Sequence, residues 1–212
     1  MKHLFITTGI CLLSLAVFSQ TKDHKSMVSV GGSIQQYHGD LGNGFYKSNN
    51  VTYGAFNLGF DRYLNRSFDL KLALVYGDWG YCPPPGEEEE HAENGEEEVE
   101  LDLSSRMFTA YLACKYKFAN GYILKENSKL APFVYVGAGF NNMQDFMKID
   151  CVTVGSYASV NFGPGVQYNI TNRLNLSYNL NFGYLNSDKV DRVRKKGNDM
   201  YMQNTFCVGF NF

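Results

Sequence analysis

The sequence predicts an all-β fold, an eight-stranded antiparallel up-and-down transmembrane β-barrel, and three observations support it. Apolar and polar residues alternate with period two in eight segments of the 212-residue chain. Most of these segments have the roughly 9–11 residues that a tilted strand needs to cross a bilayer. The last segment places four apolar residues on one face: Phe206, Val208, Phe210 and Phe212. We expect this closure strand to pair with the first strand, because closing the sheet removes its edges.

The first 19 residues predict a secretory signal peptide. Lys2 and His3 form a basic start, and an apolar stretch follows over residues 4–18. Val17 and Ser19 are small residues suited to cleavage after position 19. We therefore predict a signal peptide over 1–19 and a single outer-membrane β-barrel domain over 20–212. The alternative is an uncleaved anchor, although the stretch is short for a membrane-spanning helix.

The predicted strands follow each other along the chain with few interruptions. They cover residues 27–38, 51–62, 68–77, 108–118, 132–143, 158–167, 174–184 and 200–212. The seventh is the clearest, because Leu, Tyr and Phe occupy every even position from 174 to 184 and Asn, Ser and Gly the odd ones. Pro164 lies inside the sixth segment and cannot donate a ladder hydrogen bond, so we expect a distortion or bulge there.

The connections between these strands fall into two sets. Short or moderate connections follow strands two, four and six, at Tyr63–Arg66, Ala119–Ala131 and Ile170–Asn172. Long ones follow the other strands, at Gly39–Asn50, Asp78–Leu103, Gln144–Thr153 and Asn186–Asp199. Outer-membrane barrels have short periplasmic turns and longer extracellular loops, so we expect the long set to face outward.

The polar face indicates which side of each strand meets lipid. It is rich in Asn, Ser, Thr, Gln and Gly, with few charges. The surface of a soluble barrel, the lipocalin-like alternative, would instead be rich in Lys and Glu. The apolar face carries Leu, Val and Phe, and Tyr lies near the segment ends, as in interfacial aromatic girdles. We therefore predict an apolar exterior and a polar interior.

Four short stretches are similar to the transmembrane barrel of OmpA-type outer-membrane proteins. They are residues 37–41 (YHGDL), 163–168 (GPGVQY), 172–174 (NRL) and 187–191 (SDKVD). The resemblance spans roughly residues 27–212 and implies an eight-stranded barrel in the cell outer membrane. Many such proteins continue into a peptidoglycan-binding domain, whereas this chain ends at Phe212. The resemblance therefore gives no support for a role in cell-wall tethering.

Two predicted outer loops carry opposite charge. Residues 87–102 contain nine Glu and one Asp without any Lys or Arg. Carboxylates attract Ca²⁺ or Mg²⁺, so a divalent cation or a protein partner is one interpretation, and a solvated acidic segment is the other. The last loop contains four clustered basic residues, Arg192, Arg194, Lys195 and Lys196. We predict that they contact lipopolysaccharide phosphates, although they could also face the acidic segment or solvent.

Within the barrel, we predict four inward charges: Asp69, Lys71, Lys115 and Lys117. Strands three and four are neighbours, so Asp69 is expected to pair with a Lys of strand four. Such charges either form a packed network that plugs the lumen or line a narrow ion path.

The remaining residues provide little sign of catalysis. Cys82 and Cys151 lie in loops at the same end and could pair, but the chain has no C-x-x-C zinc or redox motif. No Ser or His is placed to complete a catalytic triad, so we predict no catalytic residue, no cofactor and no resident metal. Nucleic acid is also a poor fit.

The predicted function is a non-enzymatic, structural or interaction role of the extracellular loops at the outer membrane, with lipid and lipopolysaccharide as partners. The alternatives are a narrow porin-like channel and an outer-leaflet lipid-modifying enzyme.

Overall fold

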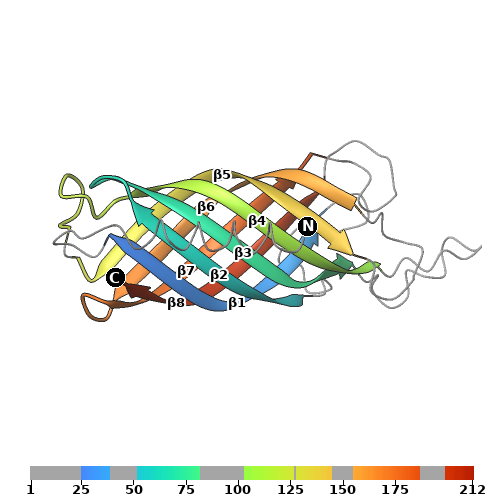
Figure 1. The fold of residues 1–212 in the computed structure, drawn as a ribbon, viewed down its shortest axis with the longest axis horizontal. Coiled ribbons are helices and arrows are strands. Elements are labelled where there is room, and N and C mark those ends of the chain that lie inside the picture. Colours follow the sequence, from blue (N-terminus) through green and yellow to red (C-terminus); the bar gives the residue numbers. More distant parts are fainter. Residues whose placement is uncertain (1–24, 39–51, 82–102, 127, 145–154, 187–198) are drawn as a thin grey trace, which may run out of the picture.

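The computed structural model describes residues 25–38, 52–81, 103–126, 128–144, 155–186 and 199–212. They form eight antiparallel strands (Figure 1): β1 (Ser26–His38), β2 (Tyr53–Tyr63), β3 (Phe68–Tyr81), β4 (Leu103–Lys117), β5 (Leu130–Gln144), β6 (Gly155–Asn169), β7 (Leu174–Leu185) and β8 (Met200–Asn211). Among these residues, no helix is long and apolar enough to span a membrane. The long connections, residues 1–19, and Cys82 and Cys151 lie outside the described residues.

The sheet closes on itself because β8 pairs with β1. Each strand also pairs with its neighbour in sequence, in the order β1 to β8. The β1–β8 register runs from Met27 opposite Asn211 to His38 opposite Met200. Beyond it, the Ser26 and Phe212 backbones exchange hydrogen bonds of 3.1 and 2.8 Å. The predicted eight-stranded antiparallel up-and-down barrel is confirmed, and the described sheet has no open edge.

The two faces of the sheet have opposite chemistry. Leu72, Leu112 and Val136 point outward and expose 40%, 50% and 57% of their surface. Asn161 and Thr109 point inward and are completely buried. A soluble barrel has the reverse arrangement, with its apolar side chains enclosed. The exterior is therefore the surface that faces lipid, and the buried polar side chains lie in the interior.

Strands β3 and β4 extend further than the alternation predicts. Their pairing continues to Tyr81 opposite Leu103, whereas we expected strand ends near 77 and 108. In this extension Arg106 Nε lies 3.1 Å from Asp78 Oδ1. Charged residues suit a part of the hairpin that has left the hydrocarbon. The hydrophobic period disappears there because lipid no longer selects one face, and this explains why the sequence underestimates the strand length.

The distortion expected at Pro164 takes a milder form than a bulge. The β6–β7 pairing is interrupted at Gly163 and Pro164 but resumes at Gly165 in the same register. On the other side, Pro164 stays in register with Val134 of β5. A side chain at Gly163 would collide with the Leu180 carbonyl oxygen, so glycine is required at this close approach.

Side-chain caps fix the two tight turns. Between β2 and β3, Asn65 Oδ1 accepts 2.9 Å hydrogen bonds from the backbone N–H groups of Ser67 and Phe68. Between β6 and β7, Thr171 Oγ1 accepts from the Leu174 N–H at 2.9 Å. Asn and Thr favour such turns because their side chains replace backbone acceptors. These turns lie at the same end of the barrel as Ser26 and Phe212.

An outward charge at mid-strand should destabilise the barrel much more than the same charge near its rim. We predict that Leu72→Arg lowers the free energy of unfolding by about 2–4 kcal/mol, and Leu130→Arg, at the start of β5, by about 0–1 kcal/mol. Reversible urea unfolding in lipid vesicles measures both values. Equal costs at the two positions would contradict a lipid-facing exterior.

Candidate functional site in the barrel interior

Five charged side chains gather inside the barrel at the end that carries Ser26 and Phe212, which we call the terminal end. They come from three neighbouring strands: Asp61 from β2, Asp69 and Lys71 from β3, and Lys115 and Lys117 from β4. The registers place Asp61 opposite Lys71 and Asp69 opposite Lys115. Antiparallel pairing therefore brings acids and bases together from distant parts of the sequence. With three Lys and two Asp, the group carries a net charge of +1 at neutral pH.

Each of these carboxylates contacts at least one lysine. Lys115 Nζ donates to Asp61 Oδ2 at 2.8 Å, and Lys117 Nζ donates to Asp69 Oδ1 at 2.5 Å. Lys71 Nζ lies 4.0 Å from Asp61 Oδ1, which accepts no hydrogen bond. Because Asp61, Lys71 and Lys115 expose less than a tenth of their surface, loss of one partner would leave an uncompensated buried charge.

Aromatic rings support the lysines from the side. Lys115 Nζ lies 4.4 Å from the centroid of the Phe133 ring, and Lys117 Nζ lies 4.4 Å from that of Tyr63. A ring face attracts a cation electrostatically, and the attraction is stronger where water is scarce. These lysines have left bulk water, and the rings replace part of the stabilisation that water would give.

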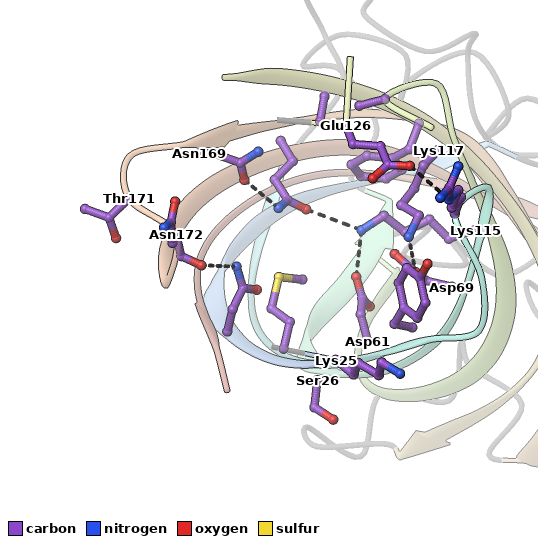
Figure 2. A pocket seen from close by; sticks show the side chains of 18 residues that line it. Lys25, Ser26, Asp61, Asp69, Lys115, Lys117, Glu126, Asn169, Thr171 and Asn172 are labelled. Atoms are coloured by element: carbon purple, nitrogen blue, oxygen red, sulfur yellow. Dashed lines mark hydrogen bonds and ion pairs between the residues drawn. The ribbon is translucent and has the colours of Figure 1, made fainter. Parts of the chain in front are cut away.

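A cavity of about 730 Å³ lies beside these charges (Figure 2). Asp61, Asp69, Lys115 and Lys117 form its charged wall, and Figure 2 shows Lys115 and Lys117 directed at the two carboxylates. Amide and hydroxyl groups form much of the opposite wall: Gln167, Asn169, Thr171, Asn172 and Asn211. These lining residues come from the strand ends and turns near Ser26 and Phe212, so the cavity belongs to that half of the lumen.

Further along the strands, hydrogen-bonded amides and tyrosines fill the interior. Tyr201 Oη lies 2.7 Å from Asn161 Oδ1 and donates to it. Asn181 Nδ2 donates to Asn161 Oδ1 at 3.1 Å and to Gln203 Oε1 at 3.0 Å. Gln203 Nε2 continues the network by donating to Gln35 Oε1 at 2.5 Å. The network connects the four neighbouring strands β6, β7, β8 and β1, and these residues are nearly or completely buried.

Large apolar side chains occupy the interior nearest the predicted outer loops. Trp79, Met107, Met143 and Leu185 expose at most 1% of their surface. They lie toward the ends of β3, β4, β5 and β7 that are remote from Ser26 and Phe212. The interior is therefore layered, with charges and a cavity at the terminal end, amides in the middle and an apolar layer beyond them.

The structure places all four of the predicted lumen charges inside the barrel, and it brings Asp69 together with Lys117. It adds Asp61, which the sequence analysis missed. Asp61 shares its strand face with Asn57 and Gly59, so the period-two pattern contains the signal. The basic cluster Arg192, Arg194, Lys195 and Lys196 and the acidic residues 87–102 lie outside the described residues.

No group of three His, Cys, Asp or Glu side chains that could hold a metal occurs in the described part of the chain. His38, at the end of β1, is the one histidine of the sequence that these residues include.

Comparisons with known proteins agree with this architecture. The model of the family described as outer membrane protein beta-barrel domain matches residues 7–212. No curated protein matches the chain.

Among solved structures, the chain is similar to Neisserial surface protein A, with 14% identity and a TM-score of 0.57 over 88% of this chain and 97% of that one. It is also similar to Ail, the attachment invasion locus protein of Yersinia pestis, with 14% identity and a TM-score of 0.52 over 90% and 99%. Ail in complex with the heparin analogue sucrose octasulfate matches with 15% identity and a TM-score of 0.50 over 89% and 98%. At these identities the similarity concerns the fold.

The ion pair between Asp61 and Lys115 should stabilise the barrel only when both partners are present. We predict that Asp61→Asn costs about 3–5 kcal/mol of unfolding free energy, because it leaves buried Lys115 without its carboxylate. Adding Lys115→Gln should recover much of this loss. Urea unfolding of the two single variants and the double variant gives the coupling energy.

The exposed pair Arg66–Glu126, at 3.2 Å, provides the control for this cycle. Arg66→Gln should cost less than about 1 kcal/mol because water screens an exposed ion pair. Independent, additive effects of the Asp61 and Lys115 substitutions would contradict a functional ion pair inside the lumen.

Proposed function

The chain belongs to the outer membrane protein beta-barrel domain family, and from this premise we propose that it is a non-enzymatic protein of the outer membrane whose barrel anchors interacting extracellular loops. The filled interior is the observation that carries this proposal. Buried side chains such as Gln35 and Trp79 fill the half of the lumen that is remote from Ser26 and Phe212. The described cavity lies at the terminal end. A barrel filled in this way is suited to holding loops at a surface.

The basic residues of the last loop supply the chemistry for one partner. Lys and Arg pair well with phosphate oxygens, and lipopolysaccharide presents phosphates at the outer surface. In this proposal Arg192, Arg194, Lys195 and Lys196 contact those phosphates. The acidic segment 87–102 offers a second contact, to a divalent cation or to an extracellular protein partner. Ail was solved with a sulfated ligand, but the proposal for this chain rests on its own basic residues.

A narrow porin-like channel is the second candidate, and the cluster of Lys71, Lys115 and Lys117 beside a cavity favours it. The packing of the other two layers argues against a channel. An ion would have to cross the amide layer and the apolar layer that contains Trp79 and Met107. The lipid-modifying enzyme is a weaker alternative. Outer-leaflet lipid that has the same mass spectrum in cells with and without the protein would remove it.

We predict that the purified barrel shows no discrete unitary conductance in planar bilayers, because buried side chains occupy the half of the lumen that is remote from the cavity. The variant Trp79→Ala tests whether the apolar layer blocks ions, since it opens space in that layer and should raise the leak current. Discrete steps in the natural protein that Lys71→Gln abolishes would contradict the proposal and support the channel.

Neutralising the basic cluster should weaken lipopolysaccharide binding. If each exposed charge contributes roughly 0.5 kcal/mol, replacing all four residues with Gln lowers affinity about thirtyfold. Lipopolysaccharide titration of the detergent-solubilised protein measures this change. The control is Arg66→Gln with Arg173→Gln, which removes two exposed basic residues from the turns at the opposite end. Unchanged lipopolysaccharide affinity in the basic-cluster variant, with folding intact, would contradict the proposed contact.

Deletion of residues 87–100 tests whether the acidic segment is separate from the fold. We expect the deletion variant to keep the heat-modifiable gel mobility of a folded barrel, because the segment contributes nothing to the strand pattern. A deletion variant that no longer shows this mobility would mean that the segment takes part in folding.

A further inference from the structure

The connection between β4 and β5 holds three consecutive apolar residues outside the barrel. Tyr122, Ile123 and Leu124 expose 81%, 57% and 39% of their surface. The connection lies at the same end as the C-terminus (Figure 1). In water, three neighbouring apolar side chains with this exposure are unfavourable, since each gains free energy when it leaves water. Their exposure in a folded turn indicates that something other than water covers them.

Hydrogen bonds define the conformation of this turn, so the exposure is part of the fold. Asn120 is 1% exposed, and its Oδ1 accepts hydrogen bonds from the backbone N–H groups of Tyr122 and Ile123 at 2.9 and 3.1 Å. The N–H of Gly121 donates to the Leu124 carbonyl at 2.8 Å. Gly121 has φ of +83°, a conformation that favours glycine. These contacts present the apolar residues 122–124 in one conformation.

This turn is continuous with the aromatic residues of the lipid-facing surface. Asn120 Nδ2 donates to the Tyr116 hydroxyl at 3.1 Å. The Tyr116 ring packs edge-to-face against Phe68 and Phe118, with centroid distances of 5.3 Å in both pairs. One buried amide therefore connects the apolar tip with an outward aromatic cluster of the kind found at membrane–water interfaces.

The two tight turns at this end show the same preference. Leu64, in the β2–β3 turn, exposes 54% of its surface, and Ile170, after β6, exposes 46%. Both continue the outward parity of the strands that precede them, so they lie on the lipid side of the rim. Apolar side chains on all three of these turns favour a membrane surface over a single protein partner.

The charges beside the apolar tip fit an anionic lipid surface. Lys125 and Lys129 are exposed and follow the tip in the same connection. The nearby acid, Glu126, forms an ion pair with Arg66. Basic residues next to apolar ones at an interface attract anionic headgroups, with a contribution that falls off within a Debye length.

We propose that the β4–β5 turn is a lipid anchor, which inserts Tyr122, Ile123 and Leu124 into the interface of the periplasmic leaflet while Lys125 and Lys129 contact anionic phospholipid headgroups. The anchor fixes the depth of the barrel at the side of β4 and β5. It is independent of the extracellular loops and therefore of their proposed partners.

A tryptophan at the tip tests this anchor. Tyr122→Trp is reconstituted in phosphatidylglycerol vesicles, and quenching by lipids with brominated acyl chains is measured relative to the natural protein. The natural protein is a suitable baseline because its single tryptophan, Trp79, is completely buried inside the barrel. The matched control is Asn172→Trp, in the β6–β7 turn at the cavity mouth. Heat-modifiable gel mobility verifies that each variant is folded.

The anchor predicts that brominated lipid removes most of the fluorescence added by Tyr122→Trp and that this emission is shifted to the blue, while Asn172→Trp is quenched little. Lys125→Gln with Lys129→Gln, in the Tyr122→Trp background, should reduce the difference in quenching between phosphatidylglycerol and phosphatidylcholine vesicles. Water-like emission without quenching in folded Tyr122→Trp would overturn the proposal and leave a periplasmic protein as the cover for this tip.

Discussion

Hydrocarbon cannot form hydrogen bonds with a polypeptide backbone, and the rest of this structure depends on that constraint. Each unpaired N–H or C=O group in the bilayer costs several kcal/mol, so a strand that crosses lipid needs partners on both sides. The chain meets this requirement when β8 pairs with β1 and Phe212 exchanges hydrogen bonds with Ser26. Hydrocarbon cannot satisfy side-chain amides either, so Leu, Val and Phe lie on the outer face and the amides face inward.

Closure with eight strands determines what the interior can do. A barrel of this size has room for side chains and little more. The chain fills that room in layers because each polar group withdrawn from water needs a partner. Lysines contact carboxylates at the terminal end, where a cavity remains. Amides bond to each other in the middle, and buried Trp79 and Met107 lie beyond them. The interior therefore stabilises the barrel, and this supports the proposal that partners contact the loops.

The sequence predicts the strands well wherever lipid selects one face. The expected bounds of the seventh strand, 174–184, differ from β7 by one residue. The alternation did not predict the extensions of β3 and β4, because charged residues such as Asp78 and Arg106 lie outside the hydrocarbon and interrupt the period. Four lumen charges followed from parity alone. Asp61 was missed in a weakly alternating segment, and its pairing with Lys115 depends on a register between β2, β3 and β4 that local patterns do not contain.

The central claim, lipid outside and polar groups inside, is tested most directly by spin labels placed at consecutive positions 174–184 of β7 in vesicles. Collision rates with oxygen, which concentrates in hydrocarbon, and with a water-soluble nickel complex are measured at each position. The account predicts that oxygen collisions peak at the even positions and fall at the odd ones. Nickel collisions that peak at the even positions would show that water covers the apolar face. A barrel with a lipid-facing exterior would then be wrong.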